Sequence, residues 1–210
     1  MTSLPRIFIA RHGETVWSLS GQHTGLTDLP LTETGRENAR CLGERLRGLA
    51  FAKVFTSPLQ RAATTCELAG FGPVAEVDPN LVEWDYGDYE GLRREQILSR
   101  QPGWQIFRDG CPEGESPADV AARARQIIQR LSGVSGDVLI FSSGHFLRLF
   151  TACWLKMDVL AGNCFMLSTA SLSILGYDHD LTEPAVHLWN DTRHLAQKTI
   201  HPTTSTSHRI

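Results

Sequence analysis

Short apolar runs alternate along this chain with segments whose apolar residues recur at helical spacing. The apolar runs predict strands at 6–10, 53–57, 74–78, 137–142, 171–177 and 185–189. Strands that are apolar almost throughout are typical of a parallel sheet with both faces covered, and intervening helices are typical of α/β folds. The pattern therefore predicts a three-layer α/β/α sandwich with a mostly parallel central sheet.

Helix start signals lie between the predicted strands. Ser57-Pro58 and Ser116-Pro117 each combine an N-cap serine with a proline at the first helical position, and they predict helices that run to 68 and 131. Thr32 is the expected N-cap of a third helix, and a fourth is expected over 145–155. The apolar stripe of the third helix consists of Ala39, Leu42, Leu46 and Leu49.

Composition limits the partners that this chain is expected to have. Its 210 residues are 41% hydrophobic and 20% charged, with a formal net charge of −3. This balance suits one globular domain, and the lack of a basic excess argues against a nucleic-acid partner. No apolar run approaches the roughly 18 residues that span a bilayer, and the N-terminal run predicts a strand rather than a signal peptide, so we expect no membrane partner. The sequence carries no mark of oligomeric state.

The cysteines and the C-terminal segment add two further expectations. Five cysteines without C-x-x-C spacing favour reduced thiols in a cytoplasm over a disulfide framework or a zinc site. The last residues include TTSTSH and have no apolar stripe, so we expect a mobile tail. The predicted organisation is one domain over 1–196, followed by a tail at 197–210.

Candidate chemistry lies where predicted strands end. The carboxyl ends of parallel strands meet at one edge of a sheet, where ligands bind in open α/β folds, and this places 11–13, 57–61 and 142–148 together. His12 is a candidate nucleophile beside an anion-binding Arg11, and Arg61 in the first turn of a helix would add a planar fork matched to phosphate. The alternatives are a strand that merely ends in polar residues and an ordinary exposed helix arginine.

The stretch LVEWDYGDYEGL interleaves carboxylates with aromatic residues and glycines. Aromatic neighbours desolvate a carboxyl group, as a general acid requires, so Glu83 is a candidate acid. A solvated acidic loop is the alternative for each of its carboxylates, which are Glu83, Asp85, Asp88 and Glu90.

Together these segments resemble one family. The Arg-His-Gly triplet, SPLxRAxxT, LxExxYGxxEG and GHxxR resemble the histidine phosphatase superfamily, also called the phosphoglycerate mutase-like superfamily, from residue 6 to about 195. SGQHTGLTDLPLTETG resembles the branch that includes sedoheptulose-1,7-bisphosphatase. The length of the chain favours a phosphatase, because the mutases generally carry longer insertions after the EG motif.

The resemblance implies a metal-independent phosphatase that needs no cofactor and acts on a small sugar phosphate or bisphosphate. His12 would attack phosphorus and become a phosphohistidine, Arg11 and Arg61 would hold the phosphoryl oxygens, and Glu83 would protonate the leaving alcohol. Phosphoryl transfer depends mainly on positioning and charge stabilisation, so a cluster of cations suffices chemically. The residues expected to border the substrate are Ser18, Gln22, His23, Thr24, Tyr86, His145 and Arg148.

The chain departs from the family at one catalytic position. Relatives of this branch read approximately F-A-H-G-H-F-L-R where this chain reads FSSGHFLR, so Ser143 replaces the second catalytic histidine. A serine hydroxyl is shorter and neutral, and removing one such donor typically costs about 10²–10³ in rate. The resemblance then implies a weakened phosphatase, with a catalytically silent phosphate-ligand binding protein and a phosphoglycerate mutase-type phosphotransferase as alternatives. Movement of His145 into the vacant role is the less favoured way to restore activity.

Metal ligation is the competing interpretation of His12, His23 and His145. None belongs to a helical i, i+4 histidine pair or to an H-E-x-x-H motif, so the signal for a metal is weak. The remaining histidines are expected to be surface or structural residues: His179, His187, His194, His201 and His208.

Overall fold

The computed structural model describes residues 4–198, and the predicted tail at 197–210 lies almost wholly outside them. The strands are β1 (Ile7–Arg11), β2 (Lys53–Thr56), β3 (Ala75–Val77), β4 (Val138–Ser142), β5 (Leu172–Tyr177) and β6 (Pro184–Asp191). The α-helices are α1 (Val16–Ser20), α2 (Glu33–Leu46), α3 (Gln60–Leu68), α4 (Arg94–Arg100), α5 (Ile106–Asp109), α6 (Pro117–Leu131) and α7 (Gly144–Trp154). Short 3₁₀ helices occur at Gly72–Val74, Pro79–Leu81, Gly87–Tyr89, Val159–Cys164 and Arg193–Lys198.

All the strands belong to one sheet, in the order β3-β2-β4-β1-β5-β6. The strands β3, β2, β4 and β1 run parallel, while β5 runs antiparallel to both of its neighbours. The predicted mostly parallel sheet is therefore confirmed, with one antiparallel strand inside it. Because β1 and β4 pair in parallel, their carboxyl ends lie side by side, at Arg11 and Ser142.

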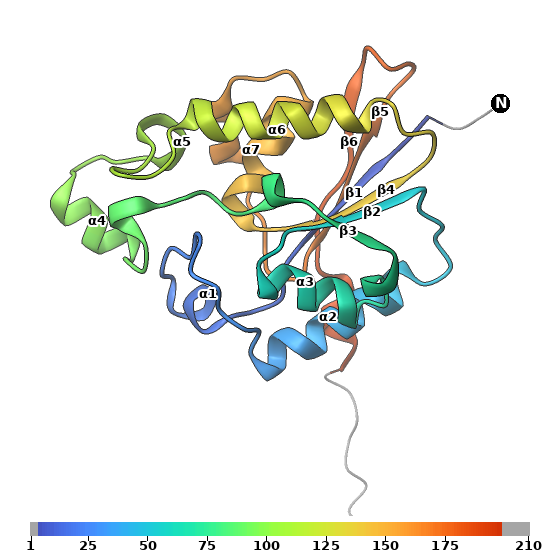
Figure 1. The fold of residues 1–210 in the computed structure, drawn as a ribbon, viewed down its shortest axis with the longest axis horizontal. Coiled ribbons are helices and arrows are strands. Elements are labelled where there is room, and N and C mark those ends of the chain that lie inside the picture. Colours follow the sequence, from blue (N-terminus) through green and yellow to red (C-terminus); the bar gives the residue numbers. More distant parts are fainter. Residues whose placement is uncertain (1–3, 199–210) are drawn as a thin grey trace, which may run out of the picture.

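Helices cover both faces of this sheet, as the three-layer prediction requires. Figure 1 shows α6 and α7 on one face and α2 and α3 on the other. Side chains alternate along β1: Ile7 and Ile9 pack in the core beneath α6 and α7, whereas Phe8 and Ala10 pack in the core with α2 and α3. A strand that buries both of its faces must be apolar throughout, which explains the continuous apolar run at the start of the chain.

Two of the predicted helix caps are confirmed. The Thr32 hydroxyl accepts a hydrogen bond from the Gly35 N–H at 3.0 Å, and α2 begins at the next residue. The Ser116 hydroxyl accepts one from the Asp119 N–H at 3.3 Å, and α6 begins at Pro117.

The predicted cap at Ser57-Pro58 is wrong, because α3 begins at Gln60. The N–H of Gln60 donates to a carboxylate oxygen of Asp28 at 2.8 Å. A residue distant in sequence therefore accepts a hydrogen bond from the first turn of α3, which is the role that Ser57 was expected to have. Arg61 nevertheless stays in the first turn. Leu49 is also misplaced: α2 ends at Leu46, Gly48 adopts φ +81°, and Leu49 is 40% exposed.

Within residues 4–198, none of the helices combines the length and the apolar character that crossing a membrane requires.

Candidate active site

A pocket of about 230 Å³ lies at the edge of the sheet where β1 and β4 end. Its wall includes every residue that was predicted to border the substrate: Ser18, Gln22, His23, Thr24, Tyr86, His145 and Arg148. Arg11, His12 and Glu83 line it too, whereas Arg61 and Ser143 are not part of the wall and are fully buried. Met166 and Leu167 also line the pocket, and sequence reasoning missed them because two apolar residues in a loop carry no signal for a site.

His12 follows β1 directly and is only 4% exposed. Its Nδ1 lies 2.7 Å from the carbonyl oxygen of Gly13. Because a carbonyl only accepts, Nδ1 carries the proton and the lone pair of Nε2 is free to attack an electrophile. Burial lowers the pKa of His12 well below its usual value, and Arg11 and Arg61 lower it further. The imidazole is therefore neutral near pH 7, as a nucleophile must be.

The contact between Gly13 and Gly35 brings α2 against the backbone that follows β1, and Thr65 joins α3 to the same backbone. A Cβ on Gly13 would lie 2.5 Å from the carbonyl oxygen of Gly35 in α2, so only glycine fits there. The Gly13 N–H donates to the Thr65 hydroxyl at 2.9 Å, and that hydroxyl donates to the Arg61 carbonyl at 2.6 Å. This chain of contacts ties the backbone beside His12 to the helix that carries Arg61.

Arg61 is held by backbone carbonyls of the loop before α2. Its Nη1 donates to Thr27 at 3.0 Å, and its Nη2 donates to Gly25 at 2.7 Å and to Thr24 at 3.2 Å. Glu90 fixes that loop in turn, because its carboxylate accepts hydrogen bonds from the Gly25 N–H at 2.9 Å and the Thr27 N–H at 3.2 Å. The Nε of Arg61 is buried and has no partner.

Like Arg61, Arg11 has some N–H donors that are hydrogen-bonded to backbone carbonyls and one that is not hydrogen-bonded. Its Nη1 donates to the carbonyl of Leu167 at 2.5 Å, while its buried Nε has no partner. Burial lowers the pKa of both Arg11 and Arg61, and the carboxyl group of Glu83 opposes that shift. Arginine keeps its charge far above pH 7, so Arg11 and Arg61 are both cations. They lie close enough to His12 to lower its pKa, and each has an Nε donor without a partner.

Ser143 occupies the N-cap position of α7 without capping it. Its hydroxyl makes no hydrogen bond to the helix and, although buried, has no partner at all. The carboxyl group of Glu83 caps α7 instead. Its Oε2 accepts a hydrogen bond from the His145 N–H at 3.0 Å, and its Oε1 accepts one from the Phe146 N–H at 2.7 Å. Because Oε1 also accepts from the Trp84 N–H at 3.0 Å, Oε2 is the oxygen with a lone pair left to hold a proton.

We call Arg11, His12, Arg61 and Ser143 the anion group. Three buried polar atoms in it lack partners: Nε of Arg11, Nε of Arg61 and Oγ of Ser143. Buried donors are normally satisfied, so three vacancies beside one histidine indicate a site for a ligand rich in acceptors. A phosphoryl group, with its oxygens and negative charge, has that character.

Four other residues of the pocket wall form an aromatic group, which we define as His23, Tyr86, His145 and Arg148. The Tyr86 hydroxyl lies 2.6 Å from Nδ1 of His145, and the ring of His145 stacks on that of His23 with centroids 5.9 Å apart. The Nε of Arg148 donates to the Gly162 carbonyl at 2.9 Å. The contacts of Tyr86 and His23 hold the His145 ring in place, which argues against the movement of His145 into the role of a second catalytic histidine.

Burial sets the charges of the aromatic group. It lowers the pKa of His145 well below the usual value, and Arg148 and His23 add to the effect. Burial also lowers the pKa of His23, although the hydrogen bond to the Leu92 carbonyl raises it in part. The pKa of Tyr86 is raised well above its usual value by burial and by Glu83. Near pH 7 the two imidazoles and the phenol are therefore neutral, and Arg148 carries the charge of this group.

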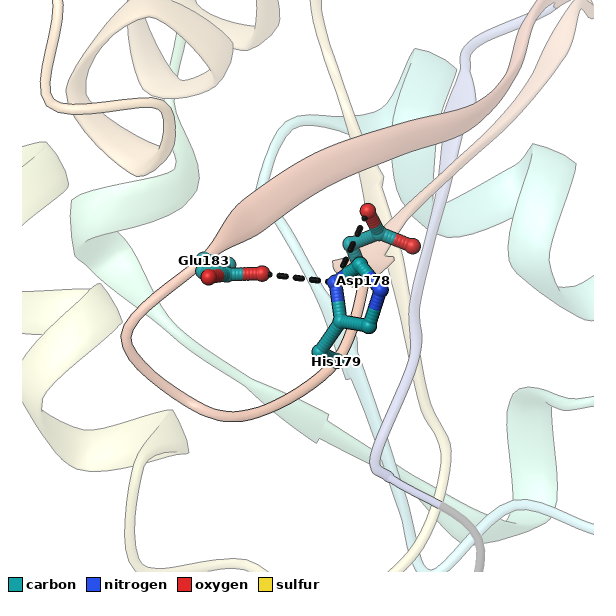
Figure 2. A group of neighbouring side chains, drawn as sticks. All are labelled: Asp178, His179 and Glu183. Atoms are coloured by element: carbon teal, nitrogen blue, oxygen red, sulfur yellow. Dashed lines mark hydrogen bonds and ion pairs between the residues drawn. The ribbon is translucent and has the colours of Figure 1, made fainter.

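The side chains that could hold a metal ion lie outside the pocket. Among the described residues, three ligating side chains meet at Asp178, His179 and Glu183, whose ligand atoms lie within 4.8 Å of one another (Figure 2). These exposed residues follow β5, which runs antiparallel to β1, so they lie at the opposite edge of the sheet from His12. In the described part of the chain, His12, His23 and His145 belong to no such cluster.

The fold and the site together define an α/β protein with a neutral histidine and two buried arginines around an anion pocket at the end of a parallel sheet. The family model for histidine phosphatase superfamily (branch 1) matches residues 7–192. The chain belongs to the histidine phosphatase superfamily, branch 1.

Individual relatives agree with this assignment. An acid phosphatase of Mycobacterium tuberculosis is 42% identical, over 86% of this chain and 91% of that protein. Sedoheptulose 1,7-bisphosphatase of Saccharomyces cerevisiae is 33% identical, over 88% of this chain and 92% of that protein, which confirms the resemblance to its branch. The solved structure of an open reading frame of Mycobacterium tuberculosis superposes with a TM-score of 0.84 at 40% identity, over 89% of this chain and 97% of that chain.

Proposed function

We propose that this protein is a metal-independent phosphomonoesterase that acts on a small sugar phosphate through a phosphohistidine at His12. The observation that carries the proposal is the anion group, which combines a neutral histidine with two arginines that act on its pKa and with three buried polar atoms that have no partner. Two fixed arginines and a hydroxyl supply the charge and the hydrogen bonds that a phosphoryl group needs as it is transferred. Membership of the family supports the same chemistry.

The reaction proceeds in two displacements. The Nε2 lone pair of His12 attacks phosphorus, a P–N bond forms, and the bond between phosphorus and the ester oxygen breaks. Glu83, protonated on Oε2, gives its proton to the leaving alkoxide. The Glu83 carboxylate then takes a proton from a water molecule that attacks phosphorus, which breaks the P–N bond, releases inorganic phosphate and restores both residues.

Ser143 weakens this catalyst in one defined way. A histidine at that position would donate a hydrogen bond to a phosphoryl oxygen and could add positive charge, whereas the Ser143 hydroxyl donates only the hydrogen bond. Its lack of a partner leaves the hydroxyl available to the phosphoryl group, directly or through water. We therefore propose reduced activity rather than none.

The size of the pocket and the similarity to sedoheptulose 1,7-bisphosphatase favour a small sugar phosphate or bisphosphate. In a bisphosphate, Arg148 and His145 are the candidates for the second phosphate, and Arg148 supplies the charge because the pKa of His145 is lowered. We further propose that 1–196 forms the catalytic domain and that the protein works in a reducing cytoplasm, where its five cysteines stay unpaired.

The test is hydrolysis of p-nitrophenyl phosphate and a panel of sugar mono- and bisphosphates by the wild type and by His12→Gln. We expect phosphate release by the wild type, an acid-labile phosphoenzyme after rapid quench, and a loss of about 10⁴-fold or more in His12→Gln, because removing a nucleophile abolishes the covalent route. Activity that survives His12→Gln would show that the mechanism is wrong.

A catalytically silent binding protein is the second candidate, and Ser143 is the observation that favours it. Calorimetric binding of a sugar phosphate without detectable phosphate release would establish it. Transfer of the phosphoryl group to a second hydroxyl, in place of water, would establish a mutase-type phosphotransferase instead.

A further inference from the structure

A largely buried ion pair outside the pocket joins Glu115, which directly precedes the N-cap of α6, to Arg123 in the second turn of that helix. The Nε of Arg123 donates to Oε1 of Glu115 at 2.7 Å and its Nη2 donates to Oε2 at 2.8 Å, so the pairing is bidentate. The two side chains are only 16% and 21% exposed. Removing two charges from water has a desolvation penalty, and the attraction between the charges seldom exceeds it by much. Stabilisation of the fold alone therefore does not explain why this ion pair is present.

The same guanidinium group binds the backbone that carries Glu83. Its Nη1 donates to the carbonyls of Asn80 at 2.7 Å and Val82 at 3.3 Å, and its Nη2 reaches the Glu83 carbonyl at 3.4 Å. On the other side of Glu83, the N–H of Asp85 donates to Oε2 of Glu115 at 3.0 Å. The ion pair therefore clamps the chain before and after Glu83.

Arg123 also contacts the partner of the Glu83 side chain. Its guanidinium carbon lies 5.0 Å from the ring centroid of Phe146, and the N–H of Phe146 is the donor that binds Oε1 of Glu83 at 2.7 Å. One side chain thus touches both the backbone of Glu83 and the residue that orients its carboxyl group.

We propose that Arg123, fixed by Glu115, is the positioning residue that aims Oε2 of Glu83 at the leaving oxygen of the substrate. The inference rests on the proposed function, in which Glu83 protonates the leaving alcohol. Neither Arg123 nor Glu115 lines the pocket, so both act through Glu83 and not on the substrate.

The chain offers a matched control on the same helix. Arg130 lies two helical turns after Arg123, forms an ion pair with the buried carboxylate of Asp78, and places its guanidinium carbon 4.6 Å from the ring centroid of Phe55. It repeats the ion pair and the ring contact of Arg123 but makes no hydrogen bond to the backbone of 80–85.

The test compares two esters whose leaving groups differ in their need for a proton. Glycerol 3-phosphate releases an alkoxide that must be protonated, whereas p-nitrophenyl phosphate releases a stable anion. We expect Arg123→Lys to lower the rate of phosphoenzyme formation, measured by rapid quench, about 10–100-fold for glycerol 3-phosphate and less than about 3-fold for p-nitrophenyl phosphate, because only in this step does the leaving group need the proton of Glu83. Arg130→Lys should change neither rate by more than about 3-fold.

An equal loss on both esters in Arg123→Lys would overturn the proposal, because a merely structural role lowers both rates together. Glu115→Gln is the second variant, and it should shift the ratio of the two rates in the same direction. Circular dichroism melts of each variant establish that it is folded.

Two further measurements separate this inference from the proposed function. In phosphoenzyme formation, Glu83→Gln should reproduce the selective loss on glycerol 3-phosphate; an equal loss on both esters in that step would instead refute its role as proton donor. Amide hydrogen exchange needs no turnover: we expect the Phe146 N–H to exchange about 10-fold faster in Arg123→Lys and unchanged in Arg130→Lys, because its bond to Glu83 loosens. Unchanged exchange in Arg123→Lys would overturn the positioning role, even in a protein that hydrolyses neither ester.

Discussion

Around His12, buried polar atoms of Arg11, Arg61 and Ser143 have no partner, whereas in the aromatic group the Tyr86 hydroxyl is bonded to His145 and Arg148 to the Gly162 carbonyl. Three polar atoms of the anion group therefore have no partner, and under the proposed function the substrate satisfies them. In the aromatic group the Tyr86 hydroxyl, Nδ1 of His145 and Nε of Arg148 already have protein partners, so these atoms can shape the pocket without a ligand.

This difference assigns different tasks to the two groups. Under the proposed function, unpaired donors beside buried cations stabilise the charge of the phosphoryl group as it changes during transfer, so we expect them to act on kcat. Polar atoms that already have protein partners should gain little in the transition state, so we expect them to act mainly on binding. The predictions below test that division, beginning with the largest expected effect.

Replacing one arginine from each group should separate the two tasks most clearly. We expect Arg61→Met to lower kcat/KM by about 10²–10³-fold, because it removes a donor and a charge from the transferring group. It should also lower the free energy of unfolding by about 2–4 kcal/mol, because the carbonyls of Thr24, Gly25 and Thr27 lose their donor. Kinetics with p-nitrophenyl phosphate and urea unfolding measure the two effects.

Arg148→Met is the counterpart in the aromatic group. Its kcat for p-nitrophenyl phosphate should stay within about 3-fold of the wild type, while KM for a sugar bisphosphate should rise about 10-fold. A large fall in kcat for the small aryl ester would break the division between the groups.

Ser143 gives the next effect in size. We expect Ser143→Ala to lower kcat about 10-fold, because a hydrogen bond to a charged group contributes roughly 1.5–3 kcal/mol. Ser143→His should raise kcat at least about 10-fold by restoring a cationic donor. Steady-state rates of phosphate release measure both.

Ser142 is the matched control for Ser143. Its hydroxyl is buried as well but donates to the Leu81 carbonyl at 2.6 Å, so Ser142→Ala should lower stability and leave kcat within about 3-fold of the wild type. If Ser143→Ala also kept the full rate, the vacant hydroxyl would have no part in catalysis.

A smaller effect is expected from Tyr86→Phe, which removes the partner of Nδ1 of His145. KM for sugar phosphates should rise about 3–10-fold while kcat for p-nitrophenyl phosphate is unchanged, because one hydrogen bond that orders the binding wall is lost. Tyr89→Phe is the control, since the hydroxyl of Tyr89 bonds to Gln101 outside the pocket. Equal effects of the two variants would remove the aromatic group from substrate binding.

The smallest effect concerns stability and pH. The pKa of His12 is lowered in the folded protein, mainly by burial, so below about pH 6.5 the unfolded chain binds a proton that the folded protein does not. Stability should therefore fall as pH decreases from 6.5 and be unaffected by this group above it. Each such histidine contributes at most about 1.4 kcal/mol per pH unit.

Urea unfolding between pH 7 and pH 5 measures this slope. His12→Gln should lose stability less steeply than the wild type, because it lacks one group that binds a proton only when unfolded. Identical slopes would show that His12 is protonated in the folded protein, which would also remove its role as a neutral nucleophile.

Strand positions and the pocket edge could be read from the sequence because both depend on local patterns. Continuous apolar runs reflect strands buried on two faces, and the parallel order then brings Arg11 and Ser142 together. The start of α3 could not be read in the same way. Asp28 caps it from a distant loop, and no local pattern around Ser57 reports a partner that far along the chain.

Residues that act through other residues were missed for a similar reason. Arg123 lies on an ordinary amphipathic helix, and nothing in its neighbours shows that its fork reaches the carbonyls of Asn80 and Val82. Glu90 stood out only as one carboxylate in an acidic stretch, whereas the structure shows it holding the loop that binds Arg61. Such tasks depend on tertiary contacts, which a single sequence does not encode locally.

The pairing of β1 with β4 has a consequence for the order of events during synthesis. His12 is made long before β4, yet its N–H bonds to the Ser142 carbonyl, and β1 pairs with β4 from Ile7 to Arg11. The ribosome must therefore add β4 before β1 has its parallel neighbour. A nascent chain that stops before β4 carries His12, the proposed nucleophile, without the pocket, so we expect no activity until β4 has been made and has paired with β1.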